Sequence, residues 1–358
     1  MDRAKKNIAN HHGLNEWKLD GAPVPISVAV DSVAVGTSTF QDNTERFPIS
    51  NFVECHGDTL PEIPTVITGG CKDWNAFSSP GATWSVDDLA ERTNDNLSLD
   101  GGPGFARMSI CRGTVPLKEY QRYCNAEADG DSTPLYIFDP DILKATFVDG
   151  TLVADDYQIP PCFRCDAMEC LTGTRFRPLP PAWLLVGVKR SGTPIHDHPM
   201  TVAWNALLVG CKLWCCLPPG IDERFLLLNL DGDGAIKEDF DKSAIDWFQK
   251  IGQLPSGAKI IVQRPGEIVF LPAGWFHVVL NIETSTAISV SLTLRRDIRK
   301  AFHFLVSTAE DVEMAKGWLK SLESNVDRTT KAVGITLEDL SQLRTLVYDA
   351  CKNSGTNI

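Results

Sequence analysis

Short apolar runs dominate the second half of the chain. They lie between residues 183 and 217 and between residues 259 and 294, and Gly and Pro interrupt them at short intervals. Runs of this length, separated by turn residues, indicate short β-strands. A succession of such strands is typical of a β-barrel or a β-sandwich. The pattern therefore predicts a mainly β core in this half of the chain.

Apolar runs in the first half predict further strands and helices. Residues 63–68 and 135–138 are apolar runs of strand length, and a Gly pair ends the first of them. A helix is expected to start after Ser85, because Ser is a favoured N-cap and two Asp residues follow in the first turn. Residues 115–124 have helical spacing. We therefore expect helices beside the β core.

The C-terminal part of the chain has a different pattern. From Asp297 onward apolar residues recur at helical spacing, as at Phe302, Leu305 and Leu322, and Gly334 is expected to interrupt the helices. The first residues are polar and lack a pattern. The sequence thus predicts a flexible N-terminal arm (1–45), a β domain with flanking helices (46–296) and a helical C-terminal extension (297–358).

Composition and charge narrow the classes of partner. The chain has 358 residues, of which 43% are apolar, enough for a sizeable core. Its net charge is −12 and its pI is about 5.1. An acidic chain is a poor binder of phosphate backbones, so nucleic acid is not expected as a main partner. The charge favours a basic protein or peptide.

Cysteine usage and hydropathy indicate the compartment. The eleven Cys are an odd number at irregular spacing, which does not fit a disulfide framework and favours a reducing compartment. The N-terminus lacks the apolar stretch of a secretory signal, and no apolar run is long enough to cross a membrane. We expect a soluble protein of the nucleus or cytoplasm.

Three histidines lie in the two segments with the strongest motifs. His196 and His198 belong to RSGTPIHDHPMTVAWN (190–205), and His277 belongs to RPGEIVFLPAGWFHVVLN (264–281). Residues two apart on a strand project to the same face, so His196 and His198 can bind one metal ion together. His277, from a distant strand, would complete the set and leave coordination positions open. Open positions on an iron site suit O2 and a chelating co-substrate.

These segments, with the upstream PLYIFD (134–139), resemble the Jumonji C (JmjC) oxygenases. The resemblance runs from about Phe47 to about Leu294 and is strongest to the lysyl hydroxylases and arginine demethylases of the branch once called the phosphatidylserine receptor. It implies a cupin-like double-stranded β-helix that binds iron(II) and 2-oxoglutarate. It also implies hydroxylation, or demethylation through hydroxylation, of a Lys or Arg side chain in a protein.

The resemblance also implies roles for single residues. His196 and His277 match the two iron histidines of the family, and Lys212 matches the lysine that pairs with the distal carboxylate of 2-oxoglutarate. The positions that match the family's hydrogen-bonding contacts to the co-substrate are Tyr136, Thr193, Asn205 and Ser289; Ser289 falls where the family often has Thr.

The third metal ligand departs from the family motif His-x-Asp. Here the triplet is His196-Asp197-His198, and one residue is missing before the Ala-Trp-Asn segment. Either His198 replaces the aspartate, or a bulge turns Asp197 inward as the ligand. We favour His198, because strand alternation puts it beside His196.

Two other functions stay open on the sequence alone. A broken ligand set would leave a catalytically impaired JmjC protein that acts as a binding module. A three-histidine cupin dioxygenase that does without 2-oxoglutarate would not need Lys212, Asn205 and Tyr136. The helical extension could also form a homodimer contact, although simple packing against the barrel explains its apolar stripe.

Overall fold

A computed structural model describes residues 40–52, 60–79, 83–93, 96–98, 114–131, 134–180, 182–222, 224–227, 243–307, 311–326 and 333–354. The predicted arm lies mostly outside these ranges, since only its residues 40–45 are described.

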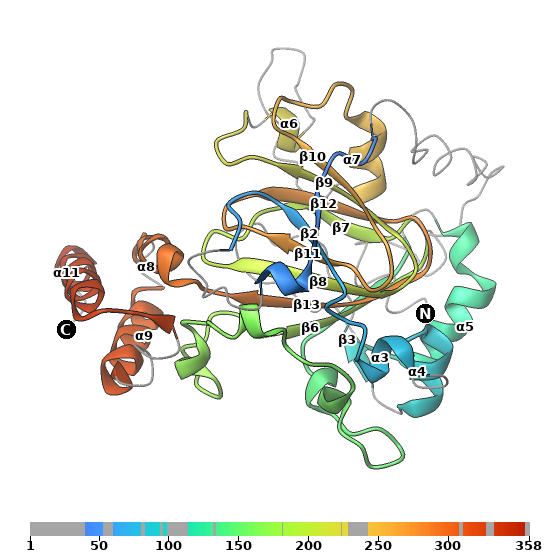
Figure 1. Cartoon of the computed structure of the whole chain (residues 1–358), viewed down its shortest axis with the longest axis horizontal. Coiled ribbons are helices and arrows are strands. Elements are labelled where there is room, and N and C mark those ends of the chain that lie inside the picture. Colours follow the sequence, from blue (N-terminus) through green and yellow to red (C-terminus); the bar gives the residue numbers. More distant parts are fainter. Residues whose placement is uncertain are drawn as a thin grey trace.

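Two sheets face each other and form the barrel (Figure 1). The larger has the order β1-β2-β11-β8-β13-β6-β5, the smaller has the order β10-β9-β12-β7, and a separate pair joins β3 to β4. The strands are β1 (Arg46–Pro48), β2 (Thr65–Thr68), β3 (Asn96–Ser98), β4 (Thr114–Pro116), β5 (Tyr136–Asp139), β6 (Ala182–Gly187), β7 (Gly192–His196), β8 (Val202–Val209), β9 (Lys212–Leu217), β10 (Lys259–Gln263), β11 (Ile268–Leu271), β12 (Phe276–Asn281) and β13 (Ser285–Leu292).

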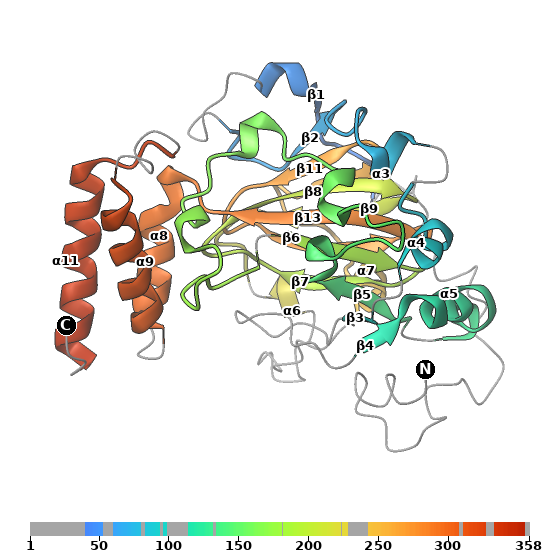
Figure 2. The same cartoon turned by 90° about the horizontal axis from the view of Figure 1, so that it is seen from below.

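Helices cover the barrel from several sides. The α-helices are α3 (Asn75–Ser78), α4 (Val86–Arg92), α5 (Leu117–Ala126), α6 (Arg224–Leu227), α7 (Ala244–Lys250), α8 (Ile298–Val306), α9 (Val312–Ser324) and α11 (Leu337–Ser354). Short 3-10 turns lie at Ile49–Phe52, Ala128–Gly130, Ile142–Lys144, Val153–Asp156, Pro161–Phe163, Glu169–Leu171 and Arg295–Asp297. In both views the C-terminal helices α8, α9 and α11 lie at the opposite end of the molecule from α4 and α5 (Figures 1 and 2).

Strand β8 shows how the sequence divides side chains between two cores. Ala203 faces the barrel interior, where it packs in one cluster with Trp214 of the opposite sheet. Trp204 faces outward and stacks on Phe163, with ring centroids 5.5 Å apart. Both faces of the strand are therefore covered, which explains why β8 is apolar at every position except Asn205 instead of alternating.

Several local expectations are confirmed. Ser85 caps α4 by accepting a hydrogen bond from the amide of Asp88, and Gly334, with φ +79°, separates α9 from α11. The helix expected at 115–124 begins two residues later, because residues 114–116 form β4. Among the described residues, no helix combines the length and the apolar character needed to cross a membrane.

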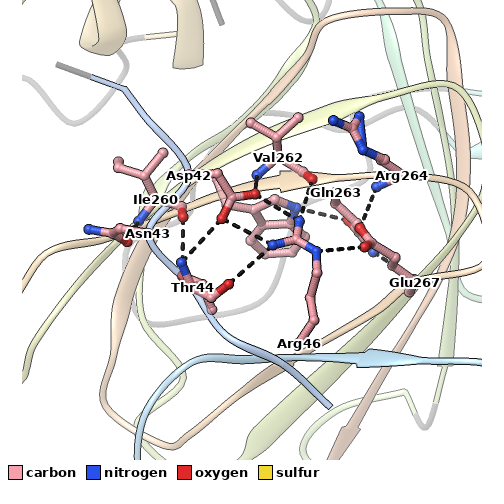
Figure 3. Close-up of polar contacts among 10 residues, drawn as sticks. Asp42, Asn43, Thr44, Arg46, Ile260, Val262, Gln263, Arg264 and Glu267 are labelled. Carbon is pink, nitrogen blue, oxygen red and sulfur yellow. Dashed lines mark hydrogen bonds and ion pairs between the residues drawn. The ribbon is translucent and has the colours of Figure 1, made fainter. Parts of the chain in front are cut away.

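Residues 40–46 are fastened to the edge of the smaller sheet. The amide of Asn43 donates to the carbonyl of Ile260 (3.1 Å), and the amide of Val262 donates to Asp42 Oδ2 (3.0 Å). Arg46, the first residue of β1 in the larger sheet, links the two sheets: its Nε donates to Glu267 Oε1 (2.8 Å) and its Nη2 donates to the carbonyl of Val262 on β10 (3.0 Å; Figure 3). The described end of the predicted arm is thus bound to the barrel, while the boundary at residue 45 stays a prediction.

Candidate metal centre

Three histidines meet inside one end of the barrel. His196 lies at the end of β7, His277 lies on β12, and the two are direct cross-strand partners. His198 follows β7 by two residues. One ring nitrogen from each of the three can be chosen so that all lie within 4.8 Å of one another. This spacing lets the three imidazoles bind a single metal ion.

Local backbone features produce this arrangement. The β7–β12 pairing shifts register between His277 and Val279, which marks an irregularity beside the site. His198 is anchored by its carbonyl, which accepts a hydrogen bond from the amide of Gly274 at 3.1 Å. Because β7 ends at His196, strand alternation does not carry His198 to the site, and that part of the expectation is wrong. The loop after β7 brings its ring there instead.

Hydrogen bonds at Nδ1 orient all three rings. Nδ1 of His196 lies 2.8 Å from the carbonyl oxygen of Pro194, and Nδ1 of His277 lies 3.2 Å from that of Trp275. Nδ1 of His198 lies 3.4 Å from Thr201 Oγ1. A carbonyl oxygen can only accept, so Nδ1 carries the proton in His196 and His277. Their Nε2 atoms then keep the lone pair that a metal requires.

Burial keeps these imidazoles neutral. It lowers the pKa of His196, and with the repulsion of His196 it lowers the pKa of His198 to about 3. Burial, followed by the repulsion of both other histidines, also lowers the pKa of His277 well below its ordinary value. Neutral imidazole is the form that binds metal, so the cluster is ready to do so at neutral pH.

Asp197 lies between two members of the cluster in sequence but is not part of the group of possible metal ligands. Burial raises the pKa of its carboxyl group. The geometry thus brings His198, and not Asp197, together with His196 and His277.

A cavity opens beside the histidines, and three more predicted site residues line it. Its wall consists of Phe138, Trp183, Leu185, Thr193, His196, His198, Ala203, Asn205, Trp214, Leu271, His277, Val279, Ser289 and Ser291. Asn205 and Ser289 are cross-strand partners on β8 and β13. Asn205 is 4% exposed, and its Oδ1 has no hydrogen-bond partner among the described residues. A buried polar atom without a partner is unfavourable, so this amide is suited to bind a ligand.

Lys212 and Tyr136 are not among the residues that line this cavity; they form a separate buried pair. Lys212 Nζ donates to Asn281 Oδ1 at 2.6 Å and lies 3.5 Å from the Tyr136 hydroxyl. Lys212 is 0% exposed, and burial lowers its pKa to about 7. Within the described ranges no carboxylate forms an ion pair with it. An ammonium buried without an anion is costly, which makes it a receptor for a carboxylate.

Sequence reasoning missed the residues that hold the site in place. Gln263 accepts a hydrogen bond from Trp214 Nε1 (2.9 Å) and donates to the carbonyl of Asn205 (2.9 Å). Trp214 in turn lies nearly parallel to the His277 ring at 5.9 Å. Asn281 stands directly opposite Lys212 in the β9–β12 pairing. Asn281 is the last residue of the motif 264–281 that contains His277, but its pairing with Lys212 can be seen only from the strand register.

Comparison with known proteins agrees with this geometry. The family model described as "JmjC domain, hydroxylase" matches residues 183–292. The chain is 31% identical over 298 residues to the bifunctional arginine demethylase and lysyl-hydroxylase psr-1 of Caenorhabditis elegans, covering 79% of this chain and 69% of that protein. The chain belongs to the JmjC family. The predicted recognition and the cupin-like JmjC fold with a C-terminal helical segment are thereby confirmed.

Other relatives of this JmjC chain vary in length. It is 31% identical over 265 residues to the lysine-specific demethylase JMJ21 of Arabidopsis thaliana, covering 71% of this chain and 26% of that protein. It is 26% identical over 283 residues to the 2-oxoglutarate and iron-dependent oxygenase JMJD4 of Gallus gallus, covering 74% of this chain and 62% of that protein. This JmjC chain therefore spans between about a quarter and about two thirds of the length of these relatives.

Proposed function

We propose that the chain is an iron(II)- and 2-oxoglutarate-dependent oxygenase that hydroxylates, or demethylates through hydroxylation, a Lys or Arg side chain of a protein. One observation carries the proposal: three neutral imidazoles converge on one point inside a JmjC barrel that also buries Lys212, which has no carboxylate partner among the described residues. The relatives' names support the cofactors, since JMJD4 is named a 2-oxoglutarate and iron-dependent oxygenase.

His196, His198 and His277 would hold the metal, with Asp197 as the alternative to His198. The residues fit a divalent transition metal, because imidazole nitrogen suits iron and three such ligands leave coordination positions for other groups. Bound iron(II) would supply the activation of O2. The protein contributes the orientation of each ring through its Nδ1 contact, and the stacked Trp214 limits movement of His277.

Lys212 would receive the distal carboxylate of 2-oxoglutarate, with Tyr136 at its side. Thr193, Asn205 and Ser289 would hydrogen-bond co-substrate oxygens from the cavity wall. The Oδ1 of Asn205, which has no partner among the described residues, supports this role. Rotation of the amide by 180° would exchange the positions of Oδ1 and Nδ2, so that Nδ2 could donate to a co-substrate oxygen. The ligand would neutralise the buried ammonium of Lys212, which compensates the desolvation of both charges.

The rest of the wall would exclude water from the reacting atoms. Leu271, Val279 and Leu185 are apolar residues of the cavity that come from both sheets. Exclusion of bulk water from the cavity strengthens the electrostatic contacts within the site and protects reactive species from side reactions. The chain's own residues thus bind, orient and shield, while the bound cofactors supply the chemistry.

The target would be a basic side chain of a protein or peptide. The name of psr-1 mentions both arginine and lysine, and that of JMJ21 mentions lysine. The net charge of −12 gives long-range attraction for a basic partner. The cavity wall contains the aromatic rings of Phe138 and Trp183, whose centroids lie 4.5 Å apart. The faces of these rings could contact a cationic side chain.

We further propose the organisation expected from the sequence: an N-terminal arm (1–45), a JmjC domain (46–296) and a helical extension (297–358). The extension is a candidate homodimer contact, and a reducing compartment, the nucleus or the cytoplasm, would suit the many free thiols.

The direct test of activity is succinate release. Purified protein with iron(II), 2-oxoglutarate and O2 should form succinate, and His277→Ala should lose both iron and turnover because it removes one of three ligands. Iron content that is unchanged in His277→Ala would contradict the proposed site. Retention of iron and 2-oxoglutarate without turnover would favour a binding module.

The same assay identifies the third ligand. His198→Ala should lower the iron content as His277→Ala does, whereas Asp197→Ala should retain iron. The opposite result would make Asp197 the ligand and require a rearranged loop after β7.

A further inference from the structure

The hydrogen-bonding groups that the structure describes around the buried Nζ of Lys212 are neutral. Its Nζ donates to the amide oxygen of Asn281 at 2.6 Å, and the Tyr136 hydroxyl lies 3.5 Å away. No described carboxylate lies within ion-pairing distance of this atom. An aspartate in place of Asn281 would neutralise the lysine within the protein. The actual residue leaves the positive charge available.

Asn281 is held so that its oxygen must face Lys212. Asn281 is fully buried, and its Nδ2 donates to Ser191 Oγ at 2.9 Å. The hydroxyl of Ser191 donates its hydrogen bond to the carbonyl of Val188 (2.7 Å), so its oxygen can only accept a hydrogen bond from Asn281. The backbone is fixed too, because the amide of Asn281 donates to the carbonyl of Ser191 (2.8 Å). The amide orientation follows from this chain of hydrogen bonds.

A glycine makes room for this assembly. A Cβ atom on Gly187 would lie 2.2 Å from Asn281 Nδ2, 2.4 Å from Ser191 Oγ and 2.6 Å from Tyr136 Cδ2. All three distances are shorter than real contacts of a Cβ atom. The side chains around Lys212 therefore pack directly on the bare backbone of β6, and a larger residue would displace them.

We propose that Asn281, oriented by Ser191 over Gly187, is a positioning residue that aims the Lys212 ammonium while leaving its charge unneutralised, so that the site selects an acid with a second, distal carboxylate. This inference rests on the proposed function. Asn281 acts only through Lys212, and its amide is a neutral acceptor whose hydrogen bond orients the ammonium without competing with an incoming anion.

Comparing the binding of two 2-oxo acids distinguishes a positioning role of Asn281 from a purely structural role. 2-Oxoglutarate has the distal carboxylate, whereas 2-oxovalerate has the same 2-oxo acid end and lacks it. Their dissociation constants would be measured with iron(II)-loaded protein without O2. Asn281→Asp keeps the shape of the side chain but adds a carboxylate beside Lys212. We expect the preference, which is the ratio of the two dissociation constants, to fall by at least about tenfold, as it would on loss of one charged hydrogen bond. The affinity for 2-oxovalerate should stay unchanged.

Ser191→Ala provides a second variant if Asn281→Asp does not fold. It removes the acceptor for Nδ2 and frees the amide to rotate, so the preference should fall by about threefold to tenfold. Thr286→Val is the matched control, because Thr286 is a buried hydroxyl residue of the same barrel without a hydrogen bond to this group. It should keep the wild-type preference.

The inference would be overturned if the folded Asn281→Asp protein kept the wild-type preference for 2-oxoglutarate over 2-oxovalerate. If Asn281→Asp does not fold, the same result for Ser191→Ala would overturn it. Failure of the proposed function would look different, because the wild-type protein itself would then bind neither acid or would not prefer 2-oxoglutarate.

Discussion

The ionisation of Lys212 depends on what binds beside it. Burial lowers its pKa to about 7, so in the empty site near neutral pH the neutral amine and the ammonium coexist. Among the described residues, the titratable groups that interact with it are the hydroxyl of Tyr136 and the thiol of Cys211. A bound carboxylate would favour the ammonium and raise the pKa of Lys212. Co-substrate binding and protonation of this lysine should therefore be coupled.

This coupling predicts the pH dependence of 2-oxoglutarate affinity. Below pH 7 the lysine already carries its proton, and the carboxylates of the ligand stay ionised down to about pH 5. Above pH 7 binding must take up a proton, so the dissociation constant should rise by about tenfold per pH unit. Isothermal titration between pH 6 and pH 9 measures this slope, with Lys212→Met as the control that lacks it. A dissociation constant that stays level from pH 7 to pH 9 would be incompatible with the coupling.

Motif residues could be predicted from the sequence, but the residues that support them could not. His196, His277, Lys212 and Asn205 stand in recognisable motifs, and the structure brings each into or beside one barrel. The roles of Asn281 and Gln263 depend on which strands pair and in which register. Register is a property of the folded sheet, and a shift by one residue would turn these side chains to the other face.

Among the structural elements, the segment 40–46 links the two sheets through one guanidinium group. Arg46 donates through Nε to Glu267 (2.8 Å), through Nη2 to Asp42 (2.7 Å) and to the carbonyl of Val262 (3.0 Å). Its Nη1 donates to the carbonyl of Thr44 (3.1 Å). The segment thereby covers the edge strand β10, whose free backbone groups would otherwise face solvent.

Arg46→Met should destabilise the fold. The side chain is 32% exposed, so solvent weakens each contact, and we expect the free energy of unfolding to fall by about 1–2 kcal/mol. Urea denaturation measures this. Lys72→Met is the matched control, since Lys72 contacts Asp73 at 4.0 Å in an exposed pair and its loss should change stability by less than about 0.5 kcal/mol. Equal stability of the two variants would show that the Arg46 contacts do not stabilise the fold.

Element prediction succeeded where local chemistry decides the outcome. The α4 start followed from the Ser85 cap, and the buried strands of the second half followed from their apolar runs. It failed at the end of β7, which stops before His198. Tertiary contacts, such as the Gly274 amide on the His198 carbonyl, decide that boundary and leave no trace in local periodicity.

On the scale of the whole molecule, the helical extension shares a core with loops beside the barrel, at Ala167, Leu171 and Met200. Trp318 of α9 is fully buried, and its Nε1 donates to the carbonyl of Ala167 at 3.1 Å. Phe176 packs so closely on Gly317 that a Cβ atom there would lie 2.2 Å from the ring. The apolar stripe of the C-terminal helices therefore packs partly against the loops beside the barrel. The apolar stripe predicted such packing, but not which loops receive it.

Metal-dependent binding of 2-oxoglutarate tests the central claim most directly, because it requires the histidine cluster and Lys212 to act on one ligand. The measurement is anaerobic calorimetric titration of 2-oxoglutarate into iron(II)-loaded protein, into metal-free protein and into His277→Ala. We predict one binding site per chain in the loaded protein and an affinity at least about tenfold weaker in the other two samples. Equal affinity in all three samples would contradict the account.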